Sequence, residues 1–552
     1  MLNVPGGFLY SGQIVLLRTI MNCTSTSLQY NKTGYFSKIV TDYLEQSAEL
    51  RAFYTHLPNL QGIKDAIESR KNFPHHRSLL VEELQKQYAG LTTMDAVKQN
   101  IRLLQDTNSF TITTAHQPAI FTGTLYFLYK ILHTIKLAAY CKEQLPQYDF
   151  IPVFYMGSED ADLDELGKIF MGNEKIVWDA KQTGAVGRMH TKGLDKIITR
   201  IEGELSVLPF GSTLIQLLKD CYLKSPDIQT ATFKLINALF AEYGLLVVIP
   251  DNGNLKKVMR PVFEDDLVHQ TPSAIVGQTI SNLSQHYKVQ ANPRAINLFY
   301  LKDNKRERIE ATGTKYEVLN TGLSFSKEEI LKELEDYPGR FSPNVILRGI
   351  FQETILPNIA FIGGGGEMAY WLELQDLFKH YHVPYPVLVL RNSFLLVEKK
   401  WKDRITKLGF DTKDFFQAEQ QLLTRLVTRN KNGELKLVNE LTEVAQLYQQ
   451  LRQKAGNIDK TLEQHIKALQ AKAERPLHEL EKKMLRAEKR KYEDQQRQIQ
   501  AVKSVLFPFN SLQERIDNFM PYYAKWGAGF ISMLYKHSLA LGSEFVVLEE
   551  EL

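Results

Sequence analysis

The sequence is poor in cysteine, has no long apolar run and carries almost no excess of charge. Its 552 residues include only three cysteines, Cys23, Cys141 and Cys221, which are spaced too widely for a disulfide framework or a metal cluster. This cysteine usage fits a reducing cytoplasm. No stretch reaches the roughly 20 apolar residues of a membrane helix, so no membrane span is expected. The first 20 residues have neither a basic leader nor a convincing small-residue cleavage site, so a signal peptide is not expected either. The net charge of +4 gives no general field for nucleic acid.

What is present is the composition of an ordinary globular protein, with 44% apolar and 24% charged residues. The length is too great for one hydrophobic core, and two to four domains are expected. A more regular amphipathic pattern begins at Met21. We therefore predict that residues 1–20 are a dispensable extension and that a core domain spans 21–395.

Apolar strands alternate with amphipathic helices through most of this core, after a helical region at 37–105. Strands are predicted at 110–114, 150–156, 175–179, 245–249, 355–362 and 387–390. Helices are predicted between most of them, at 124–141, 227–243, 254–269, 343–353 and 367–381. Such alternation predicts an α/β fold whose parallel sheet is covered on both faces. Less regular stretches near 165–225 and 270–340 are interpreted as insertions, the second with a candidate strand at 297–301.

The chain changes character after Arg391, and residues 396–505 show almost no strand signal. Apolar residues recur there at spacings of three, four or seven: Leu462, Ile466, Leu469, Ala473, Leu480, Met484 and Ala487. This heptad pattern predicts a coiled-coil arm, with a reversal at Gly456-Asn457 and a kink at Pro476. The aromatic segment 506–552 is expected to return to the core. Ser511 and Glu514 suggest a capping box for a helix over 512–519.

The first candidate site follows the predicted strand at 110–114. His116 and Gln117 would lie at the carboxyl end of the strand, where open α/β sheets bind ligands. The amides of Thr122, Gly123 and Thr124 would open the next helix towards an anion. The alternative interpretation is a surface turn with an incidental histidine.

Acidic residues form the second candidate site, after the buried-type strand at 150–156. Ser158, Glu159 and Asp160 follow Gly157 directly, and further carboxylates lie at 162–165. Crowded carboxylates favour a bound cation, an ammonium group or a shared proton. Glu159 and Asp160 are the candidates for binding an amine or Mg²⁺, or for acting as a base. The later acids are expected to cap the following helix, and capping is also the alternative for the whole cluster.

The third candidate site is the glycine run that follows the predicted strand at 355–362. Gly363, Gly364, Gly365 and Gly366 precede Glu367, which begins a helix, so several amides would be free to hold a phosphate or carboxylate. A flexible turn for tight strand–helix packing is the alternative. Three further polar residues, Asn344, Arg348 and Arg391, are candidate anion ligands or structural ion-pair partners. The histidine pairs 75–76 and 380/382 lack a carboxylate partner, so no metal site is predicted.

Taken together, these segments resemble the bacillithiol biosynthesis cysteine-adding enzymes. The resemblance lies in TTAHQPAIFTGTLYFLYKILHTIKLA (113–138), IPVFYMGSEDADLDEL (151–166), FSPNVILRGIFQETILPNIAFIGGGGEMAYWLEL (341–374) and PYPVLVLRNS (384–393). Two positions depart from the family pattern. His116 stands where the family usually has glutamine, and the glycine run lacks the usual proline. The histidine brings the first loop closer to the HIGH-type nucleotide motif of class I synthetases.

The resemblance implies a Rossmann-like core with connecting-peptide insertions and a coiled-coil arm used for homodimerisation. It also implies a ligase that joins L-cysteine to the amine of glucosaminyl-malate, completing bacillithiol. Forming an amide from a free carboxylate is uphill, so ATP is a candidate cofactor and Mg²⁺ a second one. In this interpretation His116, Gln117 and 122–124 hold phosphates or the activated carboxyl, and Glu159 and Asp160 bind the amine or a metal. The glycine run with Asn344, Arg348 and Arg391 would hold malate carboxylates or further phosphate.

Two other functions fit the same sequence. One is a nucleotidyltransferase-like or synthetase-like enzyme that acts on another small molecule. The other is a non-catalytic coiled-coil scaffold, although three ligand-type loops at strand ends are more than a scaffold requires.

Overall fold

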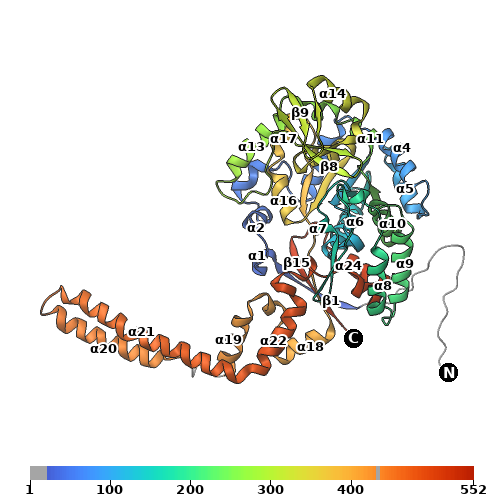
Figure 1. The fold of residues 1–552 in the computed structure, drawn as a ribbon. Coiled ribbons are helices and arrows are strands. Elements are labelled where there is room, and N and C mark those ends of the chain that lie inside the picture. Colours follow the sequence, from blue (N-terminus) through green and yellow to red (C-terminus); the bar gives the residue numbers. More distant parts are fainter. Residues whose placement is uncertain (1–21, 431–435, 552) are drawn as a thin grey trace, which may run out of the picture. The chain divides into compact units, whose positions relative to one another are not determined.

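A computed structural model describes residues 22–430 and 436–551 of the chain (Figure 1). The predicted extension at 1–20 lies outside these residues. The chain divides into two compact units, one formed by residues up to Leu395 together with Ser511–Glu551 and the other by Leu396–Asn510. Among the described residues, no helix combines the length and the apolar character needed to cross a bilayer.

A five-stranded parallel sheet forms the centre of the first unit. Its order is β13-β12-β2-β3-β6, and each neighbouring pair is parallel. The strands are β2 (Ser109–His116), β3 (Asp149–Met156), β6 (Leu246–Val248), β12 (Asn358–Gly363) and β13 (Val387–Leu390). The predicted Rossmann-like α/β core is confirmed.

The order of the strands creates a topological switch between β2 and β12. The chain enters the sheet at β2, builds outwards through β3 to β6, and then returns to the opposite side of β2 as β12 and β13. The Thr114 hydroxyl of β2 donates to the Ile362 carbonyl of β12 at 2.8 Å, close to the carboxyl ends of both strands. Open α/β sheets bind ligands beyond such a switch.

Helices cover the sheet because each presents an apolar stripe to it. Ile63 and Ile67 of α3 (Leu60–Lys71) and Leu137 of α6 (Tyr126–Gln144) share a buried cluster with Ile112 of β2 and Val387 of β13. The remaining helices of the sheet region are α10 (Ile228–Phe240), α11 (Gly253–Lys257), α12 (Arg260–Val268), α15 (Val345–Ile355), α16 (Gly365–Leu372) and α17 (Gln375–His380). The helices predicted at 254–269 and 367–381 are therefore each divided into two.

Both predicted insertions contain strands of their own. In the first, β4 (Lys168–Met171) and β5 (Glu174–Val177) form an antiparallel hairpin followed by α8 (Leu194–Leu205) and α9 (Gly211–Leu218). The strand predicted at 175–179 is thus not part of the central sheet, since only Ile176 of β5 is buried. The second holds an antiparallel sheet of order β10-β9-β8-β7-β11, in which β7 (Leu298–Lys302) is the candidate strand predicted at 297–301. Its other strands are β8 (Lys305–Thr312), β9 (Lys315–Val318), β10 (Leu323–Phe325) and β11 (Phe341–Pro343).

The two ends of the described chain meet in an antiparallel strand pair. β1 (Cys23–Gln29) pairs along its whole length with β15 (Glu544–Glu550), so the aromatic C-terminal segment does return to the core. The helix predicted over 512–519 does not form. Residues Gln513–Arg515 make a single 3₁₀ turn, and α23 (Met520–Trp526) begins later. Glu514 is drawn away from a capping role by a buried ion pair with Arg391.

Short helices complete the first unit. Those before β2 are α1 (Tyr30–Thr33), α2 (Lys38–Leu44), α4 (Arg77–Tyr88) and α5 (Asp95–Leu103), and those after it are α7 (Leu163–Leu166), α13 (Thr271–Leu283), α14 (Lys327–Asp336) and α24 (Ala528–His537). The strand β14 (Phe394–Val397) lies at the boundary of the two units.

The second unit is helical. It contains α18 (Lys399–Lys407), α19 (Glu419–Asn430), α20 (Val438–Gly456), α21 (Leu462–Lys489) and α22 (Glu493–Leu506). Figure 1 shows α20 and α21 side by side as a hairpin. The reversal falls where it was predicted, because α20 ends at Gly456. Helix α21 continues through Pro476.

Candidate active site

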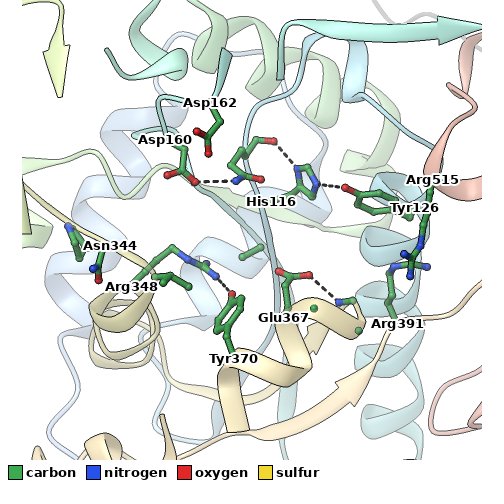
Figure 2. Close-up of a pocket in the computed structure, with 18 residues that line it drawn as sticks. His116, Tyr126, Asp160, Asp162, Asn344, Arg348, Glu367, Tyr370, Arg391 and Arg515 are labelled. Carbon is green, nitrogen blue, oxygen red and sulfur yellow. Dashed lines mark hydrogen bonds between the residues drawn. The ribbon is translucent and has the colours of Figure 1, made fainter. Parts of the chain in front are cut away.

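A cavity of about 630 Å³ lies beyond the carboxyl ends of the central strands, at the switch between β2 and β12. The loops after β2, β3 and β12 all contribute to its wall, as the three candidate motifs predicted (Figure 2). Ten of the predicted site residues line it: His116, Gln117, Asp160, Asn344, Arg348, Gly364, Gly365, Gly366, Glu367 and Arg391.

His116 is held in one orientation at the end of β2. Its Nδ1 lies 2.8 Å from the Gln117 carbonyl and its Nε2 lies 3.2 Å from the Tyr126 hydroxyl. Burial, together with the charge of Lys130, lowers the pKa of His116 to about 4, so the ring is neutral near pH 7. A carbonyl can only accept, so Nδ1 carries the proton and Nε2 accepts from Tyr126.

Helix α16 presents its N-terminus to the cavity. Three glycines, Gly364, Gly365 and Gly366, line the wall here, and the Gly364 amide donates to the Glu367 carboxylate at 2.9 Å. A Cβ on Gly366 would meet no atom within 4 Å, so the absent side chain leaves open space beside the backbone. The first amides of a helix have no partner within the helix and attract anions.

Lys130 supports the site from below its surface by pairing with Glu367, and it was not predicted from the sequence. It is 1% exposed on α6, and its Nζ lies 2.5 Å from both the Glu367 carboxylate and the Ala115 carbonyl. Burial alone would raise the pKa of Glu367, but Lys130 and the Gly364 amide outweigh it and hold that pKa below its usual value. Lys130 thus keeps Glu367 ionised. The available signal was a lysine inside the otherwise apolar run of α6.

Three arginines line the cavity. Arg348, on α15, donates to the Tyr370 hydroxyl of α16. Arg391 follows β13, is 4% exposed, and bonds the buried Glu514 at 2.7 Å while its guanidinium lies 4.9 Å from the Tyr126 ring centre. Arg515 reaches the cavity from the C-terminal segment. Tyr126, Tyr370 and Arg515 were not predicted as site residues, although all three line the cavity.

Acidic groups line another part of the cavity wall. The Asp160 carboxylate accepts from the Gln117 amide at 2.9 Å and lies 3.7 Å from Arg306, which is nearly buried. Asp162 also lines this wall (Figure 2). Asp164 and Glu165 lie in the first turn of α7, in the capping position expected for them. This edge of the cavity suits a positively charged or hydrogen-bond-donating group, such as an amine.

Glu159 does not line this cavity. Its carboxylate is paired with Lys256, which is fully buried and also lies 3.5 Å from Asp251. Burial raises the pKa of Glu159 to about 7, although Lys256 opposes the shift. The prediction that Glu159 meets a substrate amine or Mg²⁺ is therefore corrected, because its charge is already compensated inside the protein. In the described part of the chain, no group of three or more His, Cys, Asp or Glu side chains is placed to hold a metal ion.

Five other predicted residues also lie outside the cavity. The amides of Thr122 and Gly123 donate to the carbonyls of Ala119 and Ile120, so they do not face an anion. The helix begins only at Tyr126, which leaves Thr124 before its first turn. Ser158 is fully buried. Gly363 accepts from the Arg391 amide at 2.8 Å, which ties the glycine run to the end of β13. The anion role predicted for 122–124 is therefore corrected.

Comparison with known proteins gives consistent matches over the whole described chain. Residues 21–392 match the family described as "Bacillithiol biosynthesis BshC, N-terminal Rossmann-like domain", and residues 394–550 match the corresponding "C-terminal coiled-coil domain". A protein of Flavobacterium johnsoniae named "Putative cysteine ligase BshC" is 40% identical over 94% of this chain and 99% of its own length. Proteins of the same name from Flavobacterium psychrophilum and Cytophaga hutchinsonii are each 37% identical, over 95% and 91% of this chain and 99% and 94% of their own.

Proposed function

Because the chain belongs to the bacillithiol biosynthesis BshC family, we propose that it is the ligase that joins the carboxyl group of L-cysteine to the amine of glucosaminyl-malate, the last step of bacillithiol biosynthesis. The observation that carries the proposal is the mixed charge of the cavity lining. Arg348, Arg391 and Arg515 line the cavity together with the first glycines of α16, and Asp160 and Asp162 line it as well. Both substrates combine an amine with carboxylates, so each has groups for both kinds of lining residue.

The residues support distinct roles in forming the amide. Arg348, Asn344 and the α16 amides would hold carboxylates or phosphates. Asp160 would accept hydrogen bonds from the attacking amine and take its proton as the carbon–nitrogen bond forms. Neutral His116, fixed by Tyr126, presents no additional positive charge near that amine. Glu367, held by Lys130, keeps the first turn of α16 in place.

Activation of the carboxyl group is a further part of the proposal. ATP, when bound, would supply this activation, and the α16 amides with Arg391 fit its phosphates. The residues predicted for Mg²⁺ do not fit a protein-held ion, since Glu159 is neutralised by Lys256, and no step is assigned to one.

A deletion strain tests the function directly. We expect loss of bacillithiol and accumulation of glucosaminyl-malate, with both reversed by the wild-type chain but not by Arg348→Gln. An unchanged thiol pool would instead favour the second candidate, a synthetase-like enzyme acting on another small molecule. The resemblance of the loop at His116 to the HIGH-type nucleotide motif is the observation that favours this candidate.

We also propose that the chain works as a homodimer in the cytoplasm. Leu447 and Leu451 of α20 and Leu462 and Leu480 of α21 remain 38–53% exposed, an apolar surface that a second copy would cover. Light scattering after size-exclusion chromatography should give twice the mass of the chain. Replacing Leu447 and Leu451 by glutamate should give a monomer. An unchanged dimer would show that the interface lies at other residues. Cys141 and Cys221 are buried free thiols, which fits the reducing cytoplasm that the proposal assumes.

A further inference from the structure

The C-terminal segment reaches back into the active site through two consecutive residues. Glu514 is fully buried and accepts from Arg391 Nη2 at 2.7 Å and from the Ser393 hydroxyl at 3.2 Å. Arg515, the next residue, lines the cavity with its guanidinium 6.0 Å from the centre of the Phe36 ring. One 3₁₀ turn, Gln513–Arg515, thus orients one arginine of the site and supplies another.

The charges at this end of the cavity do not balance. Arg391 is compensated by Glu514, and Glu367 is compensated by Lys130. Arg515 has no carboxylate partner among the residues that the structure describes, and its recorded contact is the Phe36 ring. Figure 2 shows Arg515 and Arg391 on the same side of the cavity as Tyr126. Two guanidinium groups that line one cavity repel each other unless an anion joins them.

The backbone on this side is arranged for the same kind of ligand. The Nε of Arg391 is buried without a hydrogen-bond partner, and a Cβ built on Gly364 would lie only 3.6 Å from it. This distance is an ordinary van der Waals contact, so the guanidinium lies directly beside the N-terminus of α16. The cavity wall here combines helix amides, a fixed arginine and an uncompensated arginine.

We infer that Arg515 completes an oxyanion subsite with Arg391 and the first amides of α16, and that this subsite takes a phosphate or carboxylate group of a substrate. Arg515 is the adjustable member, because it is exposed and braced only by an aromatic ring. Arg391 is the fixed member, because Glu514 holds it. The identity of the ligand rests on the proposed function, whereas the presence of an anion subsite does not.

Two probes distinguish the sources of the oxyanion. Inorganic tripolyphosphate represents nucleotide phosphates, and L-malate represents the carboxylates of the proposed acceptor. Affinities would be measured by calorimetry at low and at physiological salt for the wild type, Arg515→Gln, Arg515→Lys and the control Arg102→Gln. Arg102 is equally an exposed arginine, at the end of α5 and away from the cavity. Thermal unfolding of each variant would confirm that it is folded.

We expect Arg515→Gln to weaken at least one probe by roughly ten- to a hundred-fold, as for a lost charge-assisted hydrogen bond. Arg515→Lys should lose part of that affinity, and Arg102→Gln none. A loss confined to tripolyphosphate assigns the subsite to nucleotide phosphate, and a loss confined to L-malate assigns it to a carboxylate. Equal affinity of all four proteins for both probes would overturn the inference. A normal thiol pool in the deletion strain would refute the proposed function but leave an Arg515-dependent anion site standing.

Discussion

Two lysine–glutamate pairs, each with a buried lysine, lie at the carboxyl ends of neighbouring parts of the sheet, and they differ in function. Glu367 lines the cavity and accepts the Gly364 amide there, while Lys130 pairs with it from a buried position on α6. Lys256 and Glu159 sit beyond β3, outside the cavity, and connect to Ser342 of the second sheet. A carboxylate at the end of a parallel strand is therefore not functional by position alone. What surrounds it decides whether it meets a ligand.

The largest expected effect is that of removing the lysine of each pair, measured both as the free energy of unfolding and as the affinity for tripolyphosphate. Lys256→Met leaves the buried Glu159 carboxylate without its cation and should lower the free energy of unfolding by about 3–5 kcal/mol in urea titrations. Lys130→Met should lower it by less, because the Glu367 side chain is 24% exposed and water partly replaces the lost cation. Only Lys130→Met should also weaken tripolyphosphate binding, because it releases Glu367 at the first turn of α16. Lys142→Met, in an exposed pair on the same helix, should change stability by no more than about 0.5 kcal/mol. Equal binding by both buried-pair variants would remove the distinction.

Activity should distinguish the two adjacent acids of the second motif. Asp160→Asn should lower kcat/KM by roughly a hundredfold, because Asp160 lines the cavity and is assigned the proton of the amine. Glu159→Gln should act chiefly on stability and leave KM for glucosaminyl-malate within a few-fold. The measurement is the rate of bacillithiol formation by the purified protein. A larger loss for Glu159→Gln than for Asp160→Asn would restore the role first predicted for Glu159.

The two pairs should respond to pH with opposite signs. Burial raises the pKa of Glu159 from 4.5 to about 7, so the folded chain binds more protons there than the unfolded chain in this interval. Its contribution to the free energy of unfolding therefore falls as pH rises from about 4.5 to 7. The pKa of Glu367 is lowered, so its contribution is present above pH 4.5 and is lost on acidification.

Urea unfolding of the wild type, Glu159→Gln and Glu367→Gln from pH 4 to 8 checks these signs. The free energy of unfolding of Glu159→Gln should rise relative to that of the wild type as pH increases from about 4.5 to 7. The free energies of unfolding of Glu367→Gln and of the wild type should be closest at the lowest pH of the series. Parallel pH profiles for the two variants would show that the pairs are electrostatically alike.

The smallest expected change concerns the space beside α16. Gly366→Ala adds a methyl group that meets no protein atom within 4 Å, so it should keep or raise stability by up to about 1 kcal/mol. The methyl would nevertheless occupy the cavity and weaken tripolyphosphate binding. Gly203→Ala, at a helical glycine of α8 with equally open surroundings, should have the same effect on stability and none on binding. Identical binding by both variants would place the ligand away from these amides.

Local sequence pattern was enough to predict the sheet, the coiled-coil hairpin and the three loops that meet at the cavity. Each of these rests on residues close together in the chain. The partners within the site do not: Lys130 and Glu367 are 237 positions apart, and Arg391 and Glu514 are 123 apart. Charge at one position says nothing about which distant group will neutralise it. For that reason the sequence predicted a ligand-binding role for Glu159 and none for Arg515.

Backbone conformation explains the error at 122–124. Phe121 and Thr122 both adopt positive φ, 49° and 66°, which is unusual for residues with a side chain. The loop is held by Asn518, whose side-chain amide donates to the carbonyls of Phe121 and Gly123. A prediction based on neighbouring residues cannot include these hydrogen bonds, because Asn518 lies far from the loop in the sequence.

The pairing of β15 with β1 and the ion pair of Glu514 with Arg391 also bear on how the protein is made. On the ribosome, the strands of the central sheet emerge long before Glu514 and Asn518 are synthesised. Until then, Arg391 is a buried cation without its counter-ion and the loop at 121–123 lacks its brace. A nascent or prematurely terminated polypeptide that lacks Glu514 and Asn518 can thus assemble its sheet without a competent ligand-binding pocket, which matures only after both residues have been synthesised.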